Sequence, residues 1–339
     1  MTDALTKMLS ERDWVMADGA TGTNLFNMGL SSGDAPELWN ADEPQNIKKL
    51  YSLAVDAGSD LFLTNTFGGN ASRLKLHNAE SRVRELNRLG AALGREVADA
   101  SGRTVIVAGS VGPTGEIMAP MGSLTHELAV EMFHEQAEGL KEGGADVLWL
   151  ETISAPEEYK AAAEAFALAG MPWCGTMSFD TAGRTMMGVT SASMVDMVEA
   201  LPNPPIAFGA NCGVGASDLM RTVLGFIASG TERPVIAKGN AGIPKYVDGH
   251  IHYDGTPELM GAYACLARDA GARIIGGCCG TMPEHLKAMR AALENTPKGP
   301  RPTLENIAVK LGGFSSASDG TGDQSDAPAR SRRNSRRRT

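Results

Sequence analysis

Short β-prone runs alternate with amphipathic segments along most of this 339-residue chain, and this alternation restricts its possible folds more than any other feature. The β-prone runs are largely apolar without clean alternation, as parallel strands covered on both faces are. The segments between them, such as residues 46–58 and 125–144, repeat apolar residues at helical spacing and end in glycine, which is typical of amphipathic helices. The predicted strands are residues 14–18, 60–67, 105–111, 146–152, 172–179, 206–212, 234–240 and 272–279.

Eight strand–helix units in succession favour a closed (β/α)8 barrel over an open sheet. A doubly wound open sheet usually carries a glycine-rich phosphate loop just after its first strand. Residues 18–25, DGATGTNL, contain only two glycines at a different spacing. We therefore predict an α/β protein whose residues 1–311 form a (β/α)8 TIM barrel.

The predicted strands end in polar or sulfur-containing side chains. In a barrel of this kind, the carboxyl ends of all the strands surround one opening, and catalytic groups lie there. Side chains that are distant in the sequence would therefore meet at this opening. The strand-end residues are Asp18, Asn65, Thr66, Ser110, Glu151, Ser178, Cys212, Asn240, Cys278 and Cys279.

Two adjacent cysteines, Cys278 and Cys279, stand in the sequence GGCCG at the end of the last predicted strand. Consecutive side chains of a regular strand point to opposite faces, so both thiols can face one point only if the strand ends or bends there, which the flanking glycines permit. Together with Cys212, they would supply three thiolates and leave a fourth position open, which is the arrangement of a catalytic zinc site. Small core cysteines are the alternative interpretation, and we assign that role to Cys174 and Cys265.

One Zn²⁺ ion per chain is therefore predicted at the C-terminal ends of the strands. A zinc ion with three sulfur ligands and one open position is suited to binding a thiol substrate, because coordination lowers the pKa of the thiol. The predicted reaction is alkyl transfer to sulfur, with no catalytic side chain beyond the zinc-activated thiolate.

Six ordered motifs, spread over roughly residues 12–295, resemble those of the zinc-dependent homocysteine S-methyltransferases. The motifs are ADGATGTNL, LTNTFGGN, GSVGPTGE, LETI, GANCGVG and GGCCGT. This family includes betaine–homocysteine methyltransferase, S-methylmethionine–homocysteine methyltransferase and the homocysteine half of cobalamin-dependent methionine synthase. The resemblance implies a (β/α)8 barrel in which homocysteine accepts a methyl group to give methionine. It also implies zinc ligands at Cys212, Cys278 and Cys279, and homocysteine contacts from Asp18, Gly19, Thr66 and Glu151.

Each predicted homocysteine contact also has a purely structural alternative. Glu151 could form a salt bridge at the barrel rim, Asp18 could cap a turn or helix, and Thr66 could be an ordinary β-branched strand residue. Apart from the resemblance, an ammonium group requires a carboxylate nearby, and Glu151 ends the fourth predicted strand at the same opening.

The identity of the methyl donor stays open in the sequence. A quaternary ammonium donor is usually held over aromatic faces, and the betaine enzymes carry an aromatic residue where this chain has Gly68 and Gly69. Trp39 could supply one aromatic wall, or it could pack its loop against the barrel. We expect betaine or a related small onium compound, including a sulfonium, as the donor. The alternative is methylcobalamin carried by a separate corrinoid protein, and a non-catalytic zinc- or thiol-binding protein is the hypothesis from another class.

Charge and composition restrict the partners and the compartment. Six arginines lie in the last ten residues, so residues 1–329 hold 25 basic against 40 acidic residues, a net charge of −15 that disfavours nucleic acid. The five cysteines, the absence of a signal-peptide pattern and the absence of a long apolar run predict a cytoplasmic protein with no membrane partner. Residues 312–339 are rich in Ser, Gly and Asp, then Arg, and are predicted to be disordered, with a tether to an acidic partner or RNA as the alternative.

Overall fold

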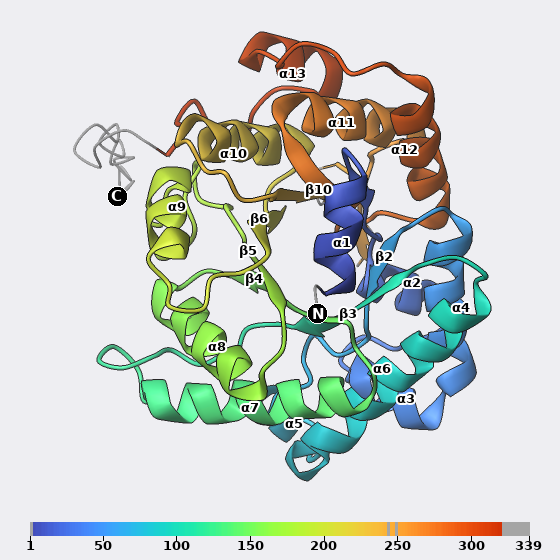
Figure 1. The fold of residues 1–339 in the computed structure, drawn as a ribbon, viewed down its shortest axis with the longest axis vertical. Helices are drawn as coiled ribbons and strands as arrows, with labels where there is room; N and C mark the ends of the chain where they lie inside the picture. The colour runs from blue at the N-terminus through green and yellow to red at the C-terminus, as the bar shows by residue number, and fades with distance from the viewer. Residues whose placement is uncertain (1–2, 243–244, 248–249, 321–339) are drawn as a thin grey trace, which may run out of the picture.

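The computed structural model describes residues 3–242, 245–247 and 250–320. Within these ranges, eight parallel strands form one sheet in the order β1-β10-β7-β6-β5-β4-β3-β2 and curve into a nearly closed barrel (Figure 1). Each predicted strand is present, so the predicted (β/α)8 fold is confirmed. The strands are β1 (Val15–Met16), β2 (Leu61–Leu63), β3 (Ile106–Val111), β4 (Val147–Ile153), β5 (Trp173–Met177), β6 (Ala207–Cys212), β7 (Val235–Gly239) and β10 (Ala272–Gly277).

Helices surround the strands as an outer ring (Figure 1). Their apolar faces pack on the outward-facing side chains of the strands, and this layer forms the largest buried cluster of the molecule. Hydroxyl side chains begin several of these helices: the Thr125 side chain, for example, accepts a hydrogen bond from the amide of Leu128 in α7. The helices are α1 (Ala4–Glu11), α2 (Thr21–Asn27), α3 (Trp39–Asp42), α4 (Pro44–Asp56), α5 (Ala71–Lys75), α6 (Val83–Ala100), α7 (His126–Glu142), α8 (Pro156–Ala169), α9 (Ser191–Glu199), α10 (Ala216–Ala228), α11 (Pro257–Ala270), α12 (Pro283–Asn295) and α13 (Leu304–Leu311), with 3₁₀ turns η1 (Pro36–Leu38) and η2 (Glu80–Arg82).

Helix α1 closes one end of the barrel. Its residues Leu5, Met8 and Leu9 are buried. They belong to the same apolar cluster as Val15 and Leu61, which lie where β1 and β2 begin. Figure 1 shows α1 lying across the ring of strands. Because parallel strands all begin at this end, a functional site must lie at the opposite, C-terminal end.

Strands β1 and β2 stand at the two ends of the sheet order, and no backbone ladder joins them in the described part of the chain. Two side-chain carboxylates connect them instead. Asp18 Oδ2 accepts a hydrogen bond from the amide of Leu63 at 2.8 Å, and Asp60 Oδ2 accepts one from the amide of Met16 at 3.0 Å. The amide of Asp60 also donates to the Met16 carbonyl at 2.7 Å. The barrel is therefore closed at this junction mainly by side chains.

A short antiparallel hairpin, β8 (Lys245–Val247) and β9 (His250–His252), follows β7 before α11 begins. The sequence analysis predicted no strand in this segment. None of the helices in the described ranges is both long enough and apolar enough to cross a bilayer.

Residues 312–320, the first part of the segment predicted to be disordered, lie against α10. The guanidinium of Arg221 stacks 3.8 Å from the ring centroid of Phe314, and Ser315 donates to the carboxylate of Asp218 from both its amide and its hydroxyl. The Ser217 hydroxyl donates to the Gly312 carbonyl at 2.8 Å. Residues 321–339 lie outside the described residues.

We expect a chain that ends at Gly312 to be less stable than a chain that ends at Gly320. The shorter chain lacks the ring of Phe314 and the hydroxyl of Ser315, which together contribute about 1–2 kcal/mol as a cation–π contact and partly exposed hydrogen bonds. For a chain of this length, that loss corresponds to a decrease in melting temperature of about 1–3 °C. Scanning calorimetry on the two truncated chains measures the difference, and equal melting temperatures would show that these contacts do not stabilise the barrel.

Candidate metal and amino-acid site

Three thiols meet at the C-terminal end of the barrel, where β6 and β10 end. The Sγ atoms of Cys212, Cys278 and Cys279 all lie within 4.8 Å of one another, and those of Cys212 and Cys279 are 3.8 Å apart. Tetrahedral zinc with Zn–S bonds of about 2.3 Å holds its sulfur ligands about 3.8 Å apart. The predicted convergence of these cysteines is confirmed, and their spacing fits one metal ion.

The backbone around the cysteines explains how neighbours in sequence share one site. β10 ends at Gly277, and the amide of Thr281 donates to the Cys278 carbonyl, which closes a turn through Cys279 and Gly280. Gly280 has φ +76°, a left-handed conformation that glycine adopts without cost. Cys212 itself has φ +60°, a conformation that is costly for a residue with a Cβ and that is typical of functional sites. Both chain segments therefore leave their strands at the thiols.

Neighbouring groups fix the orientation of the thiols. The amide of Cys279 donates to Asn240 Oδ1 at 3.0 Å, and Asn211 Nδ2 lies 3.7 Å from Cys278 Sγ. The thiols of Cys212 and Cys279 are within hydrogen-bond distance, and hydrogen bonding among the three thiols raises the pKa of Cys212 and lowers that of Cys279. Such polar neighbours hold metal ligands in position in metalloproteins.

A polar layer lies inside the barrel below the thiols. Glu151, in the second half of β4, is 9% exposed, and its Oε1 accepts a hydrogen bond from the Ser110 hydroxyl of β3 at 2.5 Å. Burial raises the pKa of Glu151 to about 7, with Lys238 opposing the shift and Cys278 adding to it. No described residue donates to the second oxygen, Oε2. Thr152, directly after Glu151, has φ +63°, so the backbone is strained here as it is at Cys212.

Asp18 lies at the same level, just after β1, and is 5% exposed. Its Oδ1 is 2.5 Å from Nζ of Lys238 in β7, and its Oδ2 accepts the amide of Leu63. Burial raises the pKa of Asp18 although Lys238 opposes this shift. Burial also acts to lower the pKa of Lys238, but the carboxylates of Asp18 and Glu151 outweigh it and leave that pKa raised. Two groups at this distance with an extra amide donor favour the charged pair, and we treat Asp18 and Lys238 as an ion pair.

The other two predicted homocysteine contacts differ in placement. A Cβ at Gly19 would lie 2.6 Å from the Thr281 carbonyl oxygen, so this position must be glycine for the first strand end to approach the cysteine turn. Thr66 is fully buried, and its hydroxyl donates to the Ser110 carbonyl at 2.7 Å. A Cβ on Gly90 of α6 would lie 2.7 Å from the Thr66 methyl group. The Thr66 side chain is therefore engaged within the fold.

Comparison with known proteins decides the family. The family model described as "Homocysteine S-methyltransferase" matches residues 15–293, which is most of the chain. The chain belongs to the homocysteine S-methyltransferase family. It is 32% identical over 313 residues to the methionine synthase of Mycobacterium tuberculosis and 30% identical over 317 residues to that of Mycobacterium leprae. These alignments cover 88% and 89% of this chain but only 26% of either methionine synthase, so the chain spans about a quarter of the length of these relatives.

Solved structures of this family have the same fold. The oxidised form of the homocysteine methyltransferase MmuM from Escherichia coli matches with a TM-score of 0.72 at 23% identity, covering 86% of this chain and 99% of MmuM. The metallated form of the same protein matches with a TM-score of 0.71 at 24% identity, covering 85% of this chain and 99% of MmuM. The chain therefore has the barrel architecture of MmuM.

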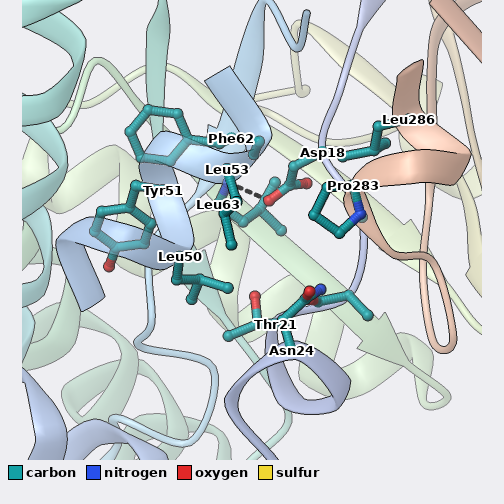
Figure 2. Close-up of a pocket in the computed structure, with 13 residues that line it drawn as sticks. Asp18, Thr21, Asn24, Leu50, Tyr51, Leu53, Phe62, Leu63, Pro283 and Leu286 are labelled. Carbon is teal, nitrogen blue, oxygen red and sulfur yellow. Dashed lines mark hydrogen bonds between the residues drawn. The ribbon is translucent and has the colours of Figure 1, made fainter. Parts of the chain in front are cut away.

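A small cavity of about 20 Å³ lies on the outer side of Asp18, between the first two strands and helices α2, α4 and α12. Figure 2 shows Asp18, with its hydrogen bond to the Leu63 amide, facing Leu50, Tyr51 and Pro283 across this space. The cavity has room for about one water molecule, and no cysteine lines it. It is therefore a packing gap at the β1–β2 junction, separate from the three-thiol cluster.

Lys238 is a buried charged residue of the site that was not among the residues predicted from the sequence. It lies one residue before the end of β7 and is 1% exposed, and its Nζ lies 5.8 Å from the ring centroid of Trp149. The signal was a lysine inside the otherwise apolar run PVIAKGN, because a lysine is almost never fully buried without a partner. The other two cysteines are placed as expected for packing: Cys174 is fully buried in the barrel interior, and Cys265 is half-buried on α11.

Proposed function

We propose that this chain transfers a methyl group to the sulfur of L-homocysteine, giving L-methionine, with one zinc ion held by Cys212, Cys278 and Cys279. The single observation that carries the proposal is the convergence of these three thiols at the carboxyl ends of the strands, the same end at which Asp18 and Glu151 are buried. Thiolate ligands favour zinc over magnesium, calcium or manganese, and a metallated form of MmuM is known. A zinc ion bound by this set supplies, at neutral pH, a substrate thiolate in place of the weakly nucleophilic thiol.

The residues of the chain hold and orient the amino acid in this proposal. Asp18, Lys238 and Glu151 together leave one buried negative charge that attracts the substrate ammonium, and Ser110 fixes the orientation of the Glu151 carboxylate through a 2.5 Å hydrogen bond. Gly19 contributes through its backbone, because the absence of a side chain lets the end of the first strand approach the cysteine turn at Thr281. In the transfer, the homocysteine sulfur forms a bond to the methyl carbon as the bond from that carbon to the donor breaks, and the thiol proton passes to solvent.

The donor is the finer part of the proposal. Neither position considered for an aromatic wall around betaine fits that role. The Gly68 amide donates to the buried carboxylate of Glu37 at 2.6 Å, and a Cβ at Gly69 would lie 2.7 Å from the Asn87 side chain. Trp39 packs against the apolar cluster that includes Leu25 and Leu50.

These contacts weigh against betaine and favour the second candidate, methyl transfer from methylcobalamin on a separate corrinoid protein. The similarity to two methionine synthases, of which this chain spans about a quarter, supports the same candidate.

A donor panel tests the reaction and separates the candidates. Zinc-loaded protein with homocysteine is given betaine, dimethylglycine, S-methylmethionine, a sulfonium acid or free methylcobalamin, and methionine is measured by mass spectrometry. Methionine from one small donor identifies a stand-alone transferase, whereas methionine from methylcobalamin alone identifies the corrinoid-dependent type. X-ray absorption at the zinc edge should show one additional sulfur ligand when homocysteine is added. A zinc store would show no change, and that result would contradict the proposed function.

Homocysteine affinity is expected to fall as the pH decreases below about 7. Burial raises the pKa of Glu151 to about 7, and only its ionised form makes an ion pair with the substrate ammonium. Below this pKa, binding must release a proton from Glu151, so affinity decreases by up to about tenfold per pH unit, and above it affinity is at its maximum. Calorimetric titrations measure this on the zinc-loaded protein.

The control ligand is 4-mercaptobutanoate, which has the same thiol and carboxylate but no ammonium group. Its pH dependence reports the thiol and the metal alone, and the difference between the two ligands isolates Glu151. Parallel pH profiles for the two ligands would exclude Glu151 as the ammonium partner.

A further inference from the structure

The amino-acid end of the site contains a buried cation to which the proposed function assigns no contact with the substrate. Lys238 projects from β7 into the barrel, is 1% exposed, and contacts Asp18 Oδ1 at 2.5 Å. Burying a charged lysine costs free energy even when a carboxylate compensates its charge. The position of Lys238 near the carboxylates of Asp18 and Glu151 therefore suggests a role for it in the site.

The two carboxylates differ in how their oxygens are occupied. Both oxygens of Asp18 are engaged within the fold, one by the Lys238 ammonium and one by the Leu63 amide at 2.8 Å. Glu151 has one oxygen bound to the Ser110 hydroxyl, while no described residue donates to the other. A second cation can therefore approach Glu151 without displacing any contact of the fold, whereas it can reach Asp18 only by displacing Lys238 or opening the β1–β2 junction.

The charges of the three groups lead to the same assignment. Asp18, Glu151 and Lys238 together carry a net charge of −1, and one substrate ammonium would neutralise it. Without Lys238 the pair of buried carboxylates would carry −2, and one ammonium would leave an uncompensated buried charge.

We propose that Lys238 is a positioning residue that reserves Asp18 for barrel closure and leaves Glu151 as the single carboxylate that binds the ammonium of the substrate. The site therefore takes a ligand with one cationic end, an α-amino acid thiol, and Asp18 acts on the substrate only through Lys238 and the β1 backbone. This inference rests on the proposed function, because it assigns the substrate contacts of that same site.

Paired ligands and paired variants test the assignment on the zinc-loaded full chain. L-homocysteine and 4-mercaptobutanoate are each titrated by calorimetry, and the ratio of their dissociation constants reports the ammonium contact alone. A charge-assisted hydrogen bond makes this ratio about 10 to 100 in the wild-type protein. Glu151→Gln should reduce the ratio to within about threefold of one.

The decisive variant is the double substitution Asp18→Asn with Lys238→Met. It removes both members of the ion pair, keeps an oxygen that can accept from the Leu63 amide, and leaves the net charge at −1. The ratio should stay within about threefold of the wild-type value. A ratio that falls to the level of Glu151→Gln would make Asp18 a direct ligand and overturn the proposal.

Thermal unfolding of the same variants gives a readout that requires no ligand. Lys238→Met alone leaves two buried carboxylates without a counter-ion, so its melting temperature should be lower than that of the double variant. A double variant whose melting temperature is no higher than that of Lys238→Met would show that Lys238 and Asp18 are not coupled, and this result would also contradict the proposal.

The failure of the proposed function has a different signature. If the wild-type protein binds neither thiol, the homocysteine site itself is wrong and the present assignment falls with it. If it binds both with a ratio near one, a thiol site exists but Glu151 does not bind the ammonium, and only the present assignment is overturned.

Discussion

Cys278→Ser is expected to release the metal and abolish methyl transfer. The substitution removes one of three sulfur ligands that stand within 4.8 Å of one another, and a serine hydroxyl is a poor ligand for zinc at neutral pH. Zinc affinity should fall on the order of 10³-fold or more, because three protein ligands are the usual minimum of a catalytic zinc site. Zinc per chain, measured by atomic emission after dialysis against a chelator, checks the result.

Cys265→Ser provides the matched control for this prediction. It is the same chemical change at a half-buried cysteine on α11, outside the three-sulfur cluster. This variant should retain one zinc ion per chain. Full activity in a metal-free Cys278→Ser protein would remove the basis of the proposed reaction.

Asp60→Ala is expected to cause a large loss of stability at the end of the barrel that α1 closes. The Asp60 side chain is 2% exposed and contacts Arg12 at 2.8 Å, Arg290 at 3.0 Å and Arg103 at 3.5 Å. It also accepts the amide of Met16, which is buried. Removing it leaves three neighbouring guanidinium groups and one buried amide without their shared acceptor, which costs about 3–4 kcal/mol of unfolding free energy.

Urea denaturation measures this loss, with Asp99→Ala as the control. Asp99 also pairs with an arginine, Arg95, at 2.8 Å, but its side chain is 69% exposed. An exposed pair of this kind contributes less than about 1 kcal/mol. Similar losses for both variants would mean that burial does not strengthen the Asp60 cluster. Zinc content should be unchanged in both, because the cluster lies at the end of the barrel opposite the thiols.

The sequence was sufficient to predict the barrel because buried parallel strands leave continuous apolar runs. All the predicted runs contain a strand, although β1 is only two residues long where five were expected. The hairpin of β8 and β9 was missed even though two short runs flank an Asp-Gly pair, a common hairpin signal. Its polar composition made it resemble a loop.

The sequence predicts those parts of the site whose chemistry follows from the type of residue. It does not predict the parts that depend on which residues pair in the fold. Three cysteines at strand ends were enough to predict, from the sequence, that their thiols converge. The ion pair of Asp18 and Lys238 joins residues more than two hundred positions apart, and only the closed barrel brings them together. For the same reason, the sequence could not indicate that the Thr66 hydroxyl is bound to the Ser110 carbonyl.

The junction between β1 and β2 has a consequence for how this protein can change. Main-chain ladders tolerate replacement of nearly any side chain, but this junction is encoded in the side chains of Asp18 and Asp60. Asp18 also belongs to the proposed amino-acid site, so altering ligand preference through Asp18 would also weaken the wall of the barrel. Substitutions of the Glu151 and Ser110 side chains can therefore change ligand selectivity without weakening the β1–β2 junction, because these side chains do not take part in it.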